Sequence, residues 1–266
     1  MGKRIISAIF LVILLVPIII YGGLVFDISV YLISLFALKE FLDIKEDKKV
    51  LPSFVKIMCY LIFTFIVFGT TYLSDNVLAI DFRVVSALFL TLLIPTILYH
   101  DKTIYSINDA FYLIGSILFL GMAFSSIIIL RNKDLAILLY LILISVLTDT
   151  YAYFGGFFIG KHKLIPEISP KKTWEGSIIG TLFCTFACSV FYHTVINPNL
   201  SYVMIIGVTL LLSIISQFGD LVFSSIKRYF GKKDFSNLIP GHGGILDRLD
   251  SIIFVALGFM FIVSVL

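Results

Sequence analysis

The chain has 266 residues, of which 59% are hydrophobic and only 14% are charged. A soluble domain carries roughly 25% charged residues, so this composition excludes an ordinary soluble protein and indicates that lipid covers most of the chain. The net charge of +3 does not indicate a nucleic-acid partner. The three cysteines lack CxxC or metal-ligand spacing and so do not indicate a zinc site.

Nine apolar runs follow one another along the chain, most of them close to the roughly 20 residues that cross a bilayer as a helix. The runs are continuous rather than alternating, so they predict helices rather than strands. The first run lacks a small-residue cleavage site and is interpreted as a retained helix, not a signal peptide. The sequence therefore predicts an all-α integral membrane protein, a polytopic bundle of about nine transmembrane helices over Ile5–Tyr21, Leu24–Leu42, Phe54–Leu73, Phe82–Tyr99, Ala110–Leu130, Leu135–Phe158, Glu175–Ile196, Tyr202–Phe223 and Leu246–Leu266.

The basic residues give this bundle an orientation. With nine spans, 17 of the 20 lysines and arginines fall on the side of the N-terminus, and only Arg83, Arg131 and Lys133 fall on the other. Cytoplasmic loops carry such an excess of basic residues. We therefore expect a multi-pass protein of the cell (inner) membrane, with a cytoplasmic N-terminus and an external C-terminus.

The connections differ in length between the two sides. On the outer side they are short, as in Gly22-Gly23, Ser74–Asp81, Arg131–Asp134 and Asn197–Ser201, whereas two inner connections, Ile159–Trp174 and Ser224–Ile245, are long and polar. Function tends to sit on such loops when a rigid scaffold holds them. We predict an N-terminal scaffold (residues 1–130, spans one to five) and a C-terminal catalytic domain (residues 131–266, spans six to nine with both cytoplasmic loops).

Two acids inside predicted spans are candidates for a functional site. Asp149 lies near the inner end of span six and Asp220 near the inner end of span eight. A carboxylate within a bilayer is costly unless it faces a partner or a wet cavity. Either acid alone fits a helix–helix hydrogen bond, but each is followed by a basic loop on the same side, which favours a functional site.

Span eight carries further polar residues out of the membrane on one helix face. Asp220, Ser224, Lys227 and Arg228 are spaced i, i+4, i+7 and i+8. The alternative for Lys227 and Arg228 is that they reach for lipid headgroups.

A glycine-rich turn and an acidic pair follow this face. Gly241, Gly243 and Gly244 surround His242, where backbone N–H groups can approach an anion. Asp247 and Asp250 flank Arg248 at the start of span nine, and Lys233 precedes the turn. One interpretation is that these acids interact favourably with the helix dipole at the start of the helix. The other is that they hold a divalent cation among basic groups, an arrangement that suits a polyphosphate ligand.

The other long loop offers a second anion site. Ser169, Lys171, Lys172 and Thr173 precede span seven, and a helix N-terminus with flanking lysines attracts anions. A positive-inside loop explains the lysines without explaining the hydroxyls. Small residues, Gly155 and Gly156, follow Asp149 and favour close helix packing. We expect basic residues outside these motifs, such as Lys45, to contribute little.

The polar segment resembles a known family signature over 27 residues. Its pattern is Ser224-x-Ile226-Lys227-Arg228-x4-Lys233-Asp234-x-Ser236-x2-Ile239-Pro240-x-His242-Gly243-Gly244-Ile245-x-Asp247-Arg248-Leu249-Asp250. It is similar to the signature of the phosphatidate cytidylyltransferases, or CDP-diacylglycerol synthases, as are 149–156 and 169–176. The resemblance implies a nucleotidyltransferase of phospholipid biosynthesis, which transfers CMP from CTP to phosphatidate and releases pyrophosphate.

The resemblance also implies roles for the candidate residues. Asp220 and Asp247 would hold Mg²⁺ with Asp250 or Asp149 nearby, and K⁺ would lie beside it. Lys227, Arg228, Lys233 and Arg248 would neutralise phosphates near Ser224, and the amides of Gly243 and Gly244 would cradle one. His242 would be a phosphate donor in preference to a general acid. Ser169, Lys171, Lys172 and Thr173 would form the second anion site, and which cluster takes CTP stays open. A homodimer is a further implication.

Two other functional classes fit the sequence less well. A CDP-alcohol phosphotransferase would show D-G-x2-A-R…G-x3-D-x3-D, which is missing from this sequence. A membrane ion or solute transporter would use Asp149 and Asp220 as ion sites. It would also have broken helices at mid-membrane and an internal repeat, and the sequence shows neither.

Overall fold

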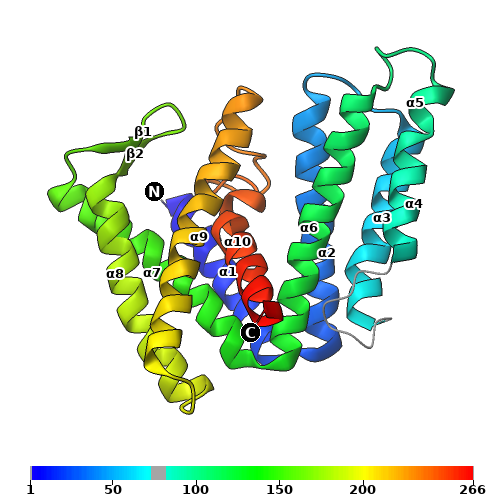
Figure 1. Ribbon diagram of the computed structural model, residues 1–266. Coiled ribbons are helices and arrows are strands. Elements are labelled where there is room, and N and C mark those ends of the chain that lie inside the picture. The colour runs from blue at the N-terminus through cyan, green and yellow to red at the C-terminus, as the bar shows by residue number, and fades with distance from the viewer. Residues whose placement is uncertain (1, 73–81, 266) are drawn as a thin grey trace. The chain divides into compact units, whose positions relative to one another are not determined.

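The structure of the protein is a computed structural model that describes residues 2–72 and 82–265 (Figure 1). The predicted connection Ser74–Asp81 lies outside the described residues. The chain divides into two compact units, one formed by Met1–Ile129 and Asp234–Leu246 and the other by Leu130–Lys233 and Asp247–Leu266. The candidate segment 224–250 is thus shared between the units, and the predicted division into scaffold and catalytic domains stays a prediction.

The first unit contains a series of helices, the last of which continues beyond Ile129 into the second unit. Gly22 and Gly23 both have positive φ values, 69° and 55°, which confirms the tight turn that separates the first two helices. The helices are α1 (Gly2–Tyr21), α2 (Gly23–Glu46), α3 (Ser53–Tyr72), α4 (Phe82–Leu93), α5 (Pro95–Leu98) and α6 (Ile107–Lys133).

The predicted fourth span is not one continuous helix. The structure ends α4 at Leu93 and starts α5 at Pro95. The interruption is a single residue, Ile94, and it falls there because proline lacks the N–H that would continue the ladder. In its bounds, the predicted run Phe82–Tyr99 agrees with the apolar helical stretch Phe82–Leu98.

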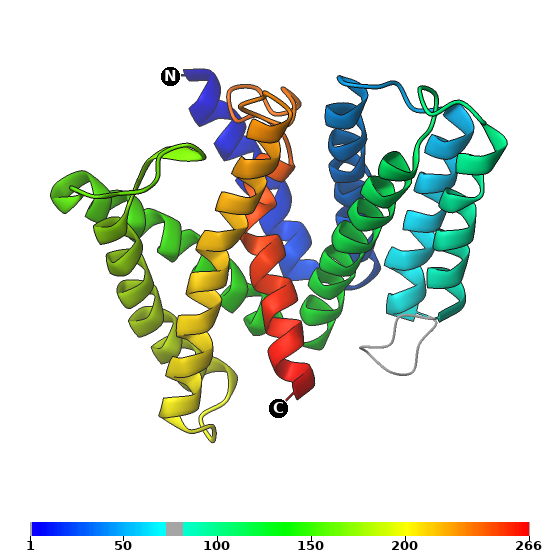
Figure 2. The same ribbon diagram turned by 45° about the horizontal axis from the view of Figure 1, so that its top comes forward.

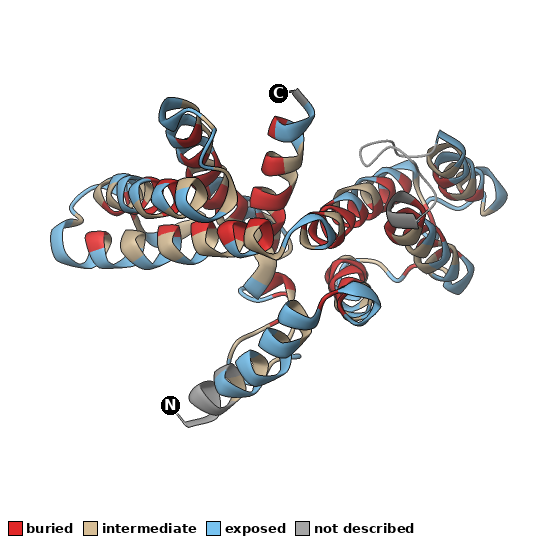
Figure 3. Ribbon diagram, turned by 90° about the horizontal axis from the view of Figure 1, so that it is seen from below, coloured by how far each residue is buried: buried red, intermediate tan, exposed pale blue. Residues whose placement is uncertain are grey.

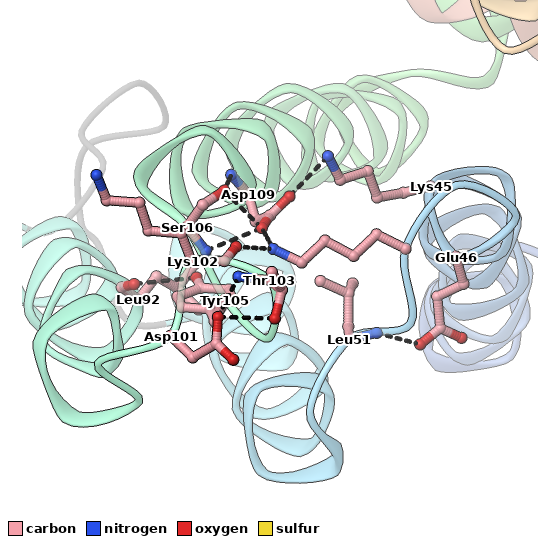
Figure 4. A network of polar contacts seen from close by, with 11 residues as sticks. Lys45, Glu46, Leu51, Leu92, Asp101, Lys102, Thr103, Tyr105, Ser106 and Asp109 are labelled. Atoms are coloured by element: carbon pink, nitrogen blue, oxygen red, sulfur yellow. Dashed lines mark hydrogen bonds and ion pairs between the residues drawn. The ribbon is translucent and has the colours of Figure 1, made fainter.

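A buried carboxylate fastens the end of α2 to the start of α6 (Figure 4). Asp109 is 2% exposed, and its two oxygens lie 2.8 Å from Lys45 Nζ and 2.5 Å from Lys49 Nζ. The Ser106 hydroxyl donates a further hydrogen bond to Asp109 at 2.7 Å. Because a buried charge is tolerated only when it is paired, Lys45 has a structural role that its position outside the motifs did not indicate.

The second unit contains long helices and one short hairpin. Its elements are α7 (Leu135–Ile159), β1 (Lys163–Ile165), β2 (Ser169–Thr173), α8 (Trp174–Phe191), a π-helical turn (Tyr192–Ile196), α9 (Tyr202–Tyr229) and, from its second residue, α10 (Leu246–Val265). In both views the hairpin lies at the same end of this unit as the C-terminal end of α9 (Figures 1 and 2).

The predicted loop Ile159–Trp174 contains a short antiparallel hairpin, although the chain is otherwise mainly helical, as the all-α prediction expected. Strand β1 pairs with β2, with Lys163 opposite Thr173 and Ile165 opposite Ser169. The sequence of β2, Ser-Pro-Lys-Lys-Thr, has no alternation of apolar and polar positions, so the periodicity that reveals most strands was missing.

Small residues let α7 and α8 pack closely. A Cβ on Gly176 would collide with the Ala152 carbonyl oxygen, and one on Gly180 would lie 2.6 Å from the Thr148 oxygen. A Cβ on Gly155 would lie 2.9 Å from Ile179 Cβ, which confirms the interpretation of the small residues after Asp149 as a close helix contact.

Apolar side chains cover much of the outer surface of these helices. Buried residues follow one side of the helices and exposed residues the other (Figure 3), and the exposed side carries large apolar residues such as Phe157, Phe186 and Phe218. Within the described chain, four helices are long and apolar enough to cross a membrane, namely α6, α7, Trp174–Ile196 and α9. The protein is therefore a mainly helical, multi-pass membrane protein.

Candidate functional site

Three helices of the second unit carry acids toward one place. Asp149 lies on α7, Asp220 on α9 and Asp250 on α10. Gly219 allows the last two to approach, because a Cβ there would lie 2.9 Å from the Asp250 carbonyl oxygen. Asp250 is within electrostatic range of both Asp220 and Asp149. Asp250, near the start of the last helix, thus lies on the element that packs against Asp220's helix, beside the two acids expected inside the membrane.

A cavity of about 550 Å³ lies against these acids. Asp149 and Asp220 line it, and so do Lys171 and Lys172 from β2. Lys172 Nζ lies 2.6 Å from Asp220 Oδ2. Sequence analysis proposed the acids and lysines from separate segments, and the fold brings them to the wall of one cavity.

Each acid in the cavity wall also contacts a hydroxyl group. Ser224, one turn beyond Asp220, donates to Asp220 Oδ1 at 3.3 Å, as the i, i+4 spacing predicted. Ser251 donates to Asp149 Oδ2 at 3.3 Å. The carboxylates are therefore held by neutral donors and by one lysine, which leaves the cavity with charges of both signs.

The hairpin is positioned by the first turn of α8. Thr173 accepts a hydrogen bond from Gly176 N at 3.2 Å and is the N-cap of α8. Glu175 accepts one from Lys161 N at 3.1 Å, and its Oε1 lies 2.6 Å from His162 Nδ1. These contacts fix both ends of the hairpin.

Of the four residues predicted as the second anion site, three line the cavity. They are Lys171, Lys172 and Thr173. Ser169 instead pairs with Ile165 at the first position of β2, the end of the strand opposite to Thr173, and does not line the cavity. Lys163, Ser177 and Gln217 also line the cavity. Sequence reasoning missed them as site residues because neither an isolated lysine in a loop nor a single polar residue inside an apolar run forms a motif.

A second ion pair connects α9 with α10. Lys227 Nζ lies 2.7 Å from Asp247 Oδ1, and both side chains are at least nine-tenths buried. Arg228, on the exposed side of α9, donates to the Lys232 carbonyl at 3.1 Å and to the Ile168 carbonyl at 3.4 Å. Asp247 is thus engaged with a lysine, while Lys233 and Arg248 are exposed.

The glycine-rich turn belongs to the first unit. His242 Nδ1 lies 2.8 Å from Ser7 Oγ, which also donates to the Pro240 carbonyl at 3.1 Å. The Gly243 carbonyl accepts a hydrogen bond from Ile239 N at 2.8 Å. The turn is therefore a closed structure held by its own backbone and by the N-terminal helix.

Glu40 holds this turn from α2. Its side chain is 3% exposed, and Oε1 accepts hydrogen bonds from Ser236 Oγ at 2.6 Å and Ile245 N at 2.9 Å. Oε2 accepts one from Leu246 N at 2.9 Å. A Cβ on Gly244 would collide with this carboxylate. Glycine at 244 thus makes room for an internal carboxylate, a contact that the anion-cradle interpretation did not include.

Magnesium fits the donor chemistry of the acids only in part. Oxygen ligands suit Mg²⁺, which is commonly bound through one or two carboxylates together with substrate phosphates. Asp220 with Asp149 or Asp250 can supply such a pair. Across the described residues, no group of three or more His, Cys, Asp or Glu lies at metal-binding spacing.

Taken together, the fold and the cavity define a membrane protein with a charged, anion-compatible cavity beside its spanning helices. The sequence model described as the cytidylyltransferase family matches residues 2–266, so the chain belongs to this family. The match includes the first five predicted spans, for which the sequence alone offered only length and hydropathy.

Relatives named phosphatidate cytidylyltransferase are similar over almost the whole chain. Those of Staphylococcus aureus (strain COL) and Staphylococcus haemolyticus (strain JCSC1435) are 38% and 37% identical over 256 residues. The one from Staphylococcus saprophyticus is 35% identical over the same length, and each match covers 96% of both chains.

Proposed function

We propose that this member of the cytidylyltransferase family transfers CMP from CTP to phosphatidate, giving CDP-diacylglycerol and pyrophosphate. A phosphate oxygen of phosphatidate forms a bond to the α-phosphorus of CTP, and the bond from that phosphorus to the leaving pyrophosphate breaks. The attacking oxygen is already anionic, so the protein need not supply a nucleophile. The observation that carries the proposal is the cavity wall, where Asp149, Asp220, Lys171 and Lys172 meet at the end of membrane-spanning helices.

The reaction requires two anions to approach each other, so positioning and charge neutralisation matter most. Lys171 and Lys172 would neutralise phosphate oxygens in the cavity, and Asp220 would orient Lys172 through their ion pair. Asp220 and Asp247 would hold Mg²⁺, with Asp250 or Asp149 nearby. When bound, Mg²⁺ supplies positive charge to the phosphate oxygens. A K⁺ ion beside it belongs to the same proposal.

The residues outside the cavity wall would act mainly by position. Lys227 would hold Asp247 in place, and the pair would fix the start of α10 against α9. His242, Gly243 and Gly244 stay candidates for phosphate donors, as the family signature implies. Arg228, Lys233 and Arg248 stay candidates for phosphate neutralisation.

The protein would lie in the cell (inner) membrane, and its site would face the cytoplasm. The excess of lysine and arginine on the side of the hairpin supports this orientation and the nine-span count. Single cysteines at Lys161, on the hairpin side, and at Asn199, on the other, would test it in a background without native cysteines. A membrane-impermeant maleimide should label Asn199→Cys in intact spheroplasts and Lys161→Cys only in inverted vesicles. The reverse pattern would overturn the orientation.

The transporter alternative finds no support in these relatives. A homodimer stays a prediction from the family resemblance. Chemical cross-linking of the purified protein at several dilutions would test it, because a specific dimer should persist on dilution while random encounters should not.

The activity is tested by pyrophosphate release from the purified protein with Mg²⁺, CTP and phosphatidate. Asp220→Asn should lose nearly all activity because it removes the charge that pairs with Lys172. Asp134→Asn is a matched control, since Asp134 is the N-cap of α7 and accepts a hydrogen bond from Ala136 N at 2.8 Å. Release in neither the wild type nor the control, over several acyl chains and divalent cations, would refute the proposal.

A further inference from the structure

An apolar groove of about 390 Å³ continues the charged cavity along the membrane-spanning helices. The cavity and the groove share Leu164, Ser177 and Gln217 in their linings. Beyond this boundary the groove is lined by side chains of β1, α8 and α9, which include Trp174, Ile178, Leu182, Ile214, Phe218 and Leu221. The second unit thus contains a charged cavity and an apolar groove that adjoin each other at these three residues.

The polar atoms at the boundary are satisfied within the protein. Gln217 Oε1 accepts the Ser177 hydroxyl at 2.5 Å, and Gln217 Nε2 donates to Thr181 Oγ1 at 2.7 Å. Nε2 also lies 3.3 Å from the Ser177 carbonyl. Because these groups bond to one another, they need no polar partner from a ligand, and the groove beyond them offers hydrocarbon and aromatic surface. Four of its side chains, Trp174, Ile178, Leu182 and Phe218, are more than half exposed.

We infer that the groove binds an acyl chain of phosphatidate while the phosphate group lies among the lysines of the cavity. The inference rests on the proposed function and adds to it the place of the lipid tail. A ligand that fills both parts must have an anionic head and a hydrocarbon tail, which excludes CTP from the groove. The groove lies on α8 and α9, two helices long and apolar enough to cross a membrane, so a chain can enter it from the surrounding lipid.

Groove-filling variants separate this role from a general effect on folding. Ile178→Trp and Leu182→Trp add bulk to side chains that line the groove from α8. Because one methylene in an apolar pocket alters specificity by about tenfold or more, each variant should raise KM for dipalmitoyl phosphatidate about tenfold in mixed micelles. The KM for dihexanoyl phosphatidate, whose tails are too short to fill the groove, should change less than about twofold.

Phe186→Trp is the matched control because Phe186 lies on the same helix, is 74% exposed and is not among the lining residues. It should leave both substrates unaffected. An equal loss with both substrates, or an unchanged KM for the long-chain substrate, would overturn the acyl-chain assignment. Absence of pyrophosphate release from either substrate in the wild type would instead refute the proposed function.

A binding measurement gives a readout that does not depend on turnover. A phosphatidate analogue with a diazirine in one acyl chain should label peptides from 174–182 and 214–221. Unlabelled phosphatidate should suppress this labelling, whereas phosphatidylcholine at the same mole fraction should not. Equal suppression by both lipids would show that bulk lipid covers the groove, and the inference would then fail.

Discussion

Replacement of Glu40 tests whether one buried carboxylate keeps the segment 236–246 closed. In Glu40→Ala, Ser236 Oγ, Ile245 N and Leu246 N all lose their acceptor. Leaving a buried donor unsatisfied costs about 1–3 kcal/mol. The two backbone N–H groups alone therefore give roughly 2–6 kcal/mol, reduced by the desolvation cost that the carboxylate itself no longer pays.

The assay is hydrogen exchange of the detergent-solubilised protein, read by mass spectrometry on peptides that cover 236–246. A local opening free energy lowered by about 3 kcal/mol speeds exchange of these amides by roughly two orders of magnitude. Glu40→Gln should have a smaller effect because one oxygen still accepts, while its amide group opposes the Leu246 N–H. Gly244→Ala should open the same segment, because its Cβ would collide with the Glu40 carboxylate.

Glu46→Ala provides the control on the same helix. Glu46 accepts from Leu51 N at 3.0 Å and pairs with Lys56, so it secures the connection between α2 and α3 and not the turn. Exchange of 236–246 should match the wild type in this variant. If Glu40→Ala also matched the wild type there, the carboxylate would not be what holds the segment.

Three further changes concern stability, each measured by thermal unfolding in detergent. Gly180→Ala should destabilise the α7–α8 contact by about 1–3 kcal/mol. Its control is Gly207→Ala, where an added Cβ meets nothing within 4 Å, and which should be neutral or stabilising by up to about 1 kcal/mol. Equal effects of the two substitutions would refute the packing argument. Lys227→Met should lower the free energy of unfolding by about 3–5 kcal/mol because it leaves Asp247 buried without the lysine. Adding Asp247→Asn should recover part of that loss. A double variant no more stable than Lys227→Met would contradict the ion pair between Lys227 and Asp247. Asp109→Asn should cost about 3 kcal/mol and exceed Lys45→Gln, because it removes both ion pairs of Figure 4 at once. The opposite order would show that Lys45 stabilises the fold through a contact other than Asp109, and would contradict this pairing argument.

The helices could be predicted closely where hydropathy alone sets their length. The run Leu135–Phe158 became α7, Leu135–Ile159, because bilayer thickness limits how long an apolar run must be. Hydropathy failed where another force sets the boundary. The apolar run of span eight stops at Phe223, yet α9 continues to Tyr229 because backbone hydrogen bonding does not require apolar side chains.

The candidate site could be predicted in its chemistry more than in its contacts. Asp149 and Asp220 are conspicuous because acids are costly inside apolar runs, and the lysines of β2 are conspicuous by their number. Glu40 carried no such signal. It sits at the end of an apolar run, where an acid is ordinarily solvated, and its partners lie 196 to 206 residues away along the chain. Only the tertiary fold brings them together.

Charge pairing explains how this membrane protein keeps so many ionic groups at the ends of apolar helices. Lys172 with Asp220 and Lys227 with Asp247 each place one cation against one anion on neighbouring elements. Pairing lowers the cost of burial, but the two pairs differ in exposure. Lys227 and Asp247 are 10% and 3% exposed, whereas Lys172 and Asp220 are 22% and 28% exposed and line the cavity. The first pair can therefore serve mainly to hold α9 and α10. The second is open to the cavity, where the proposed function requires it to exchange partners with an incoming phosphate.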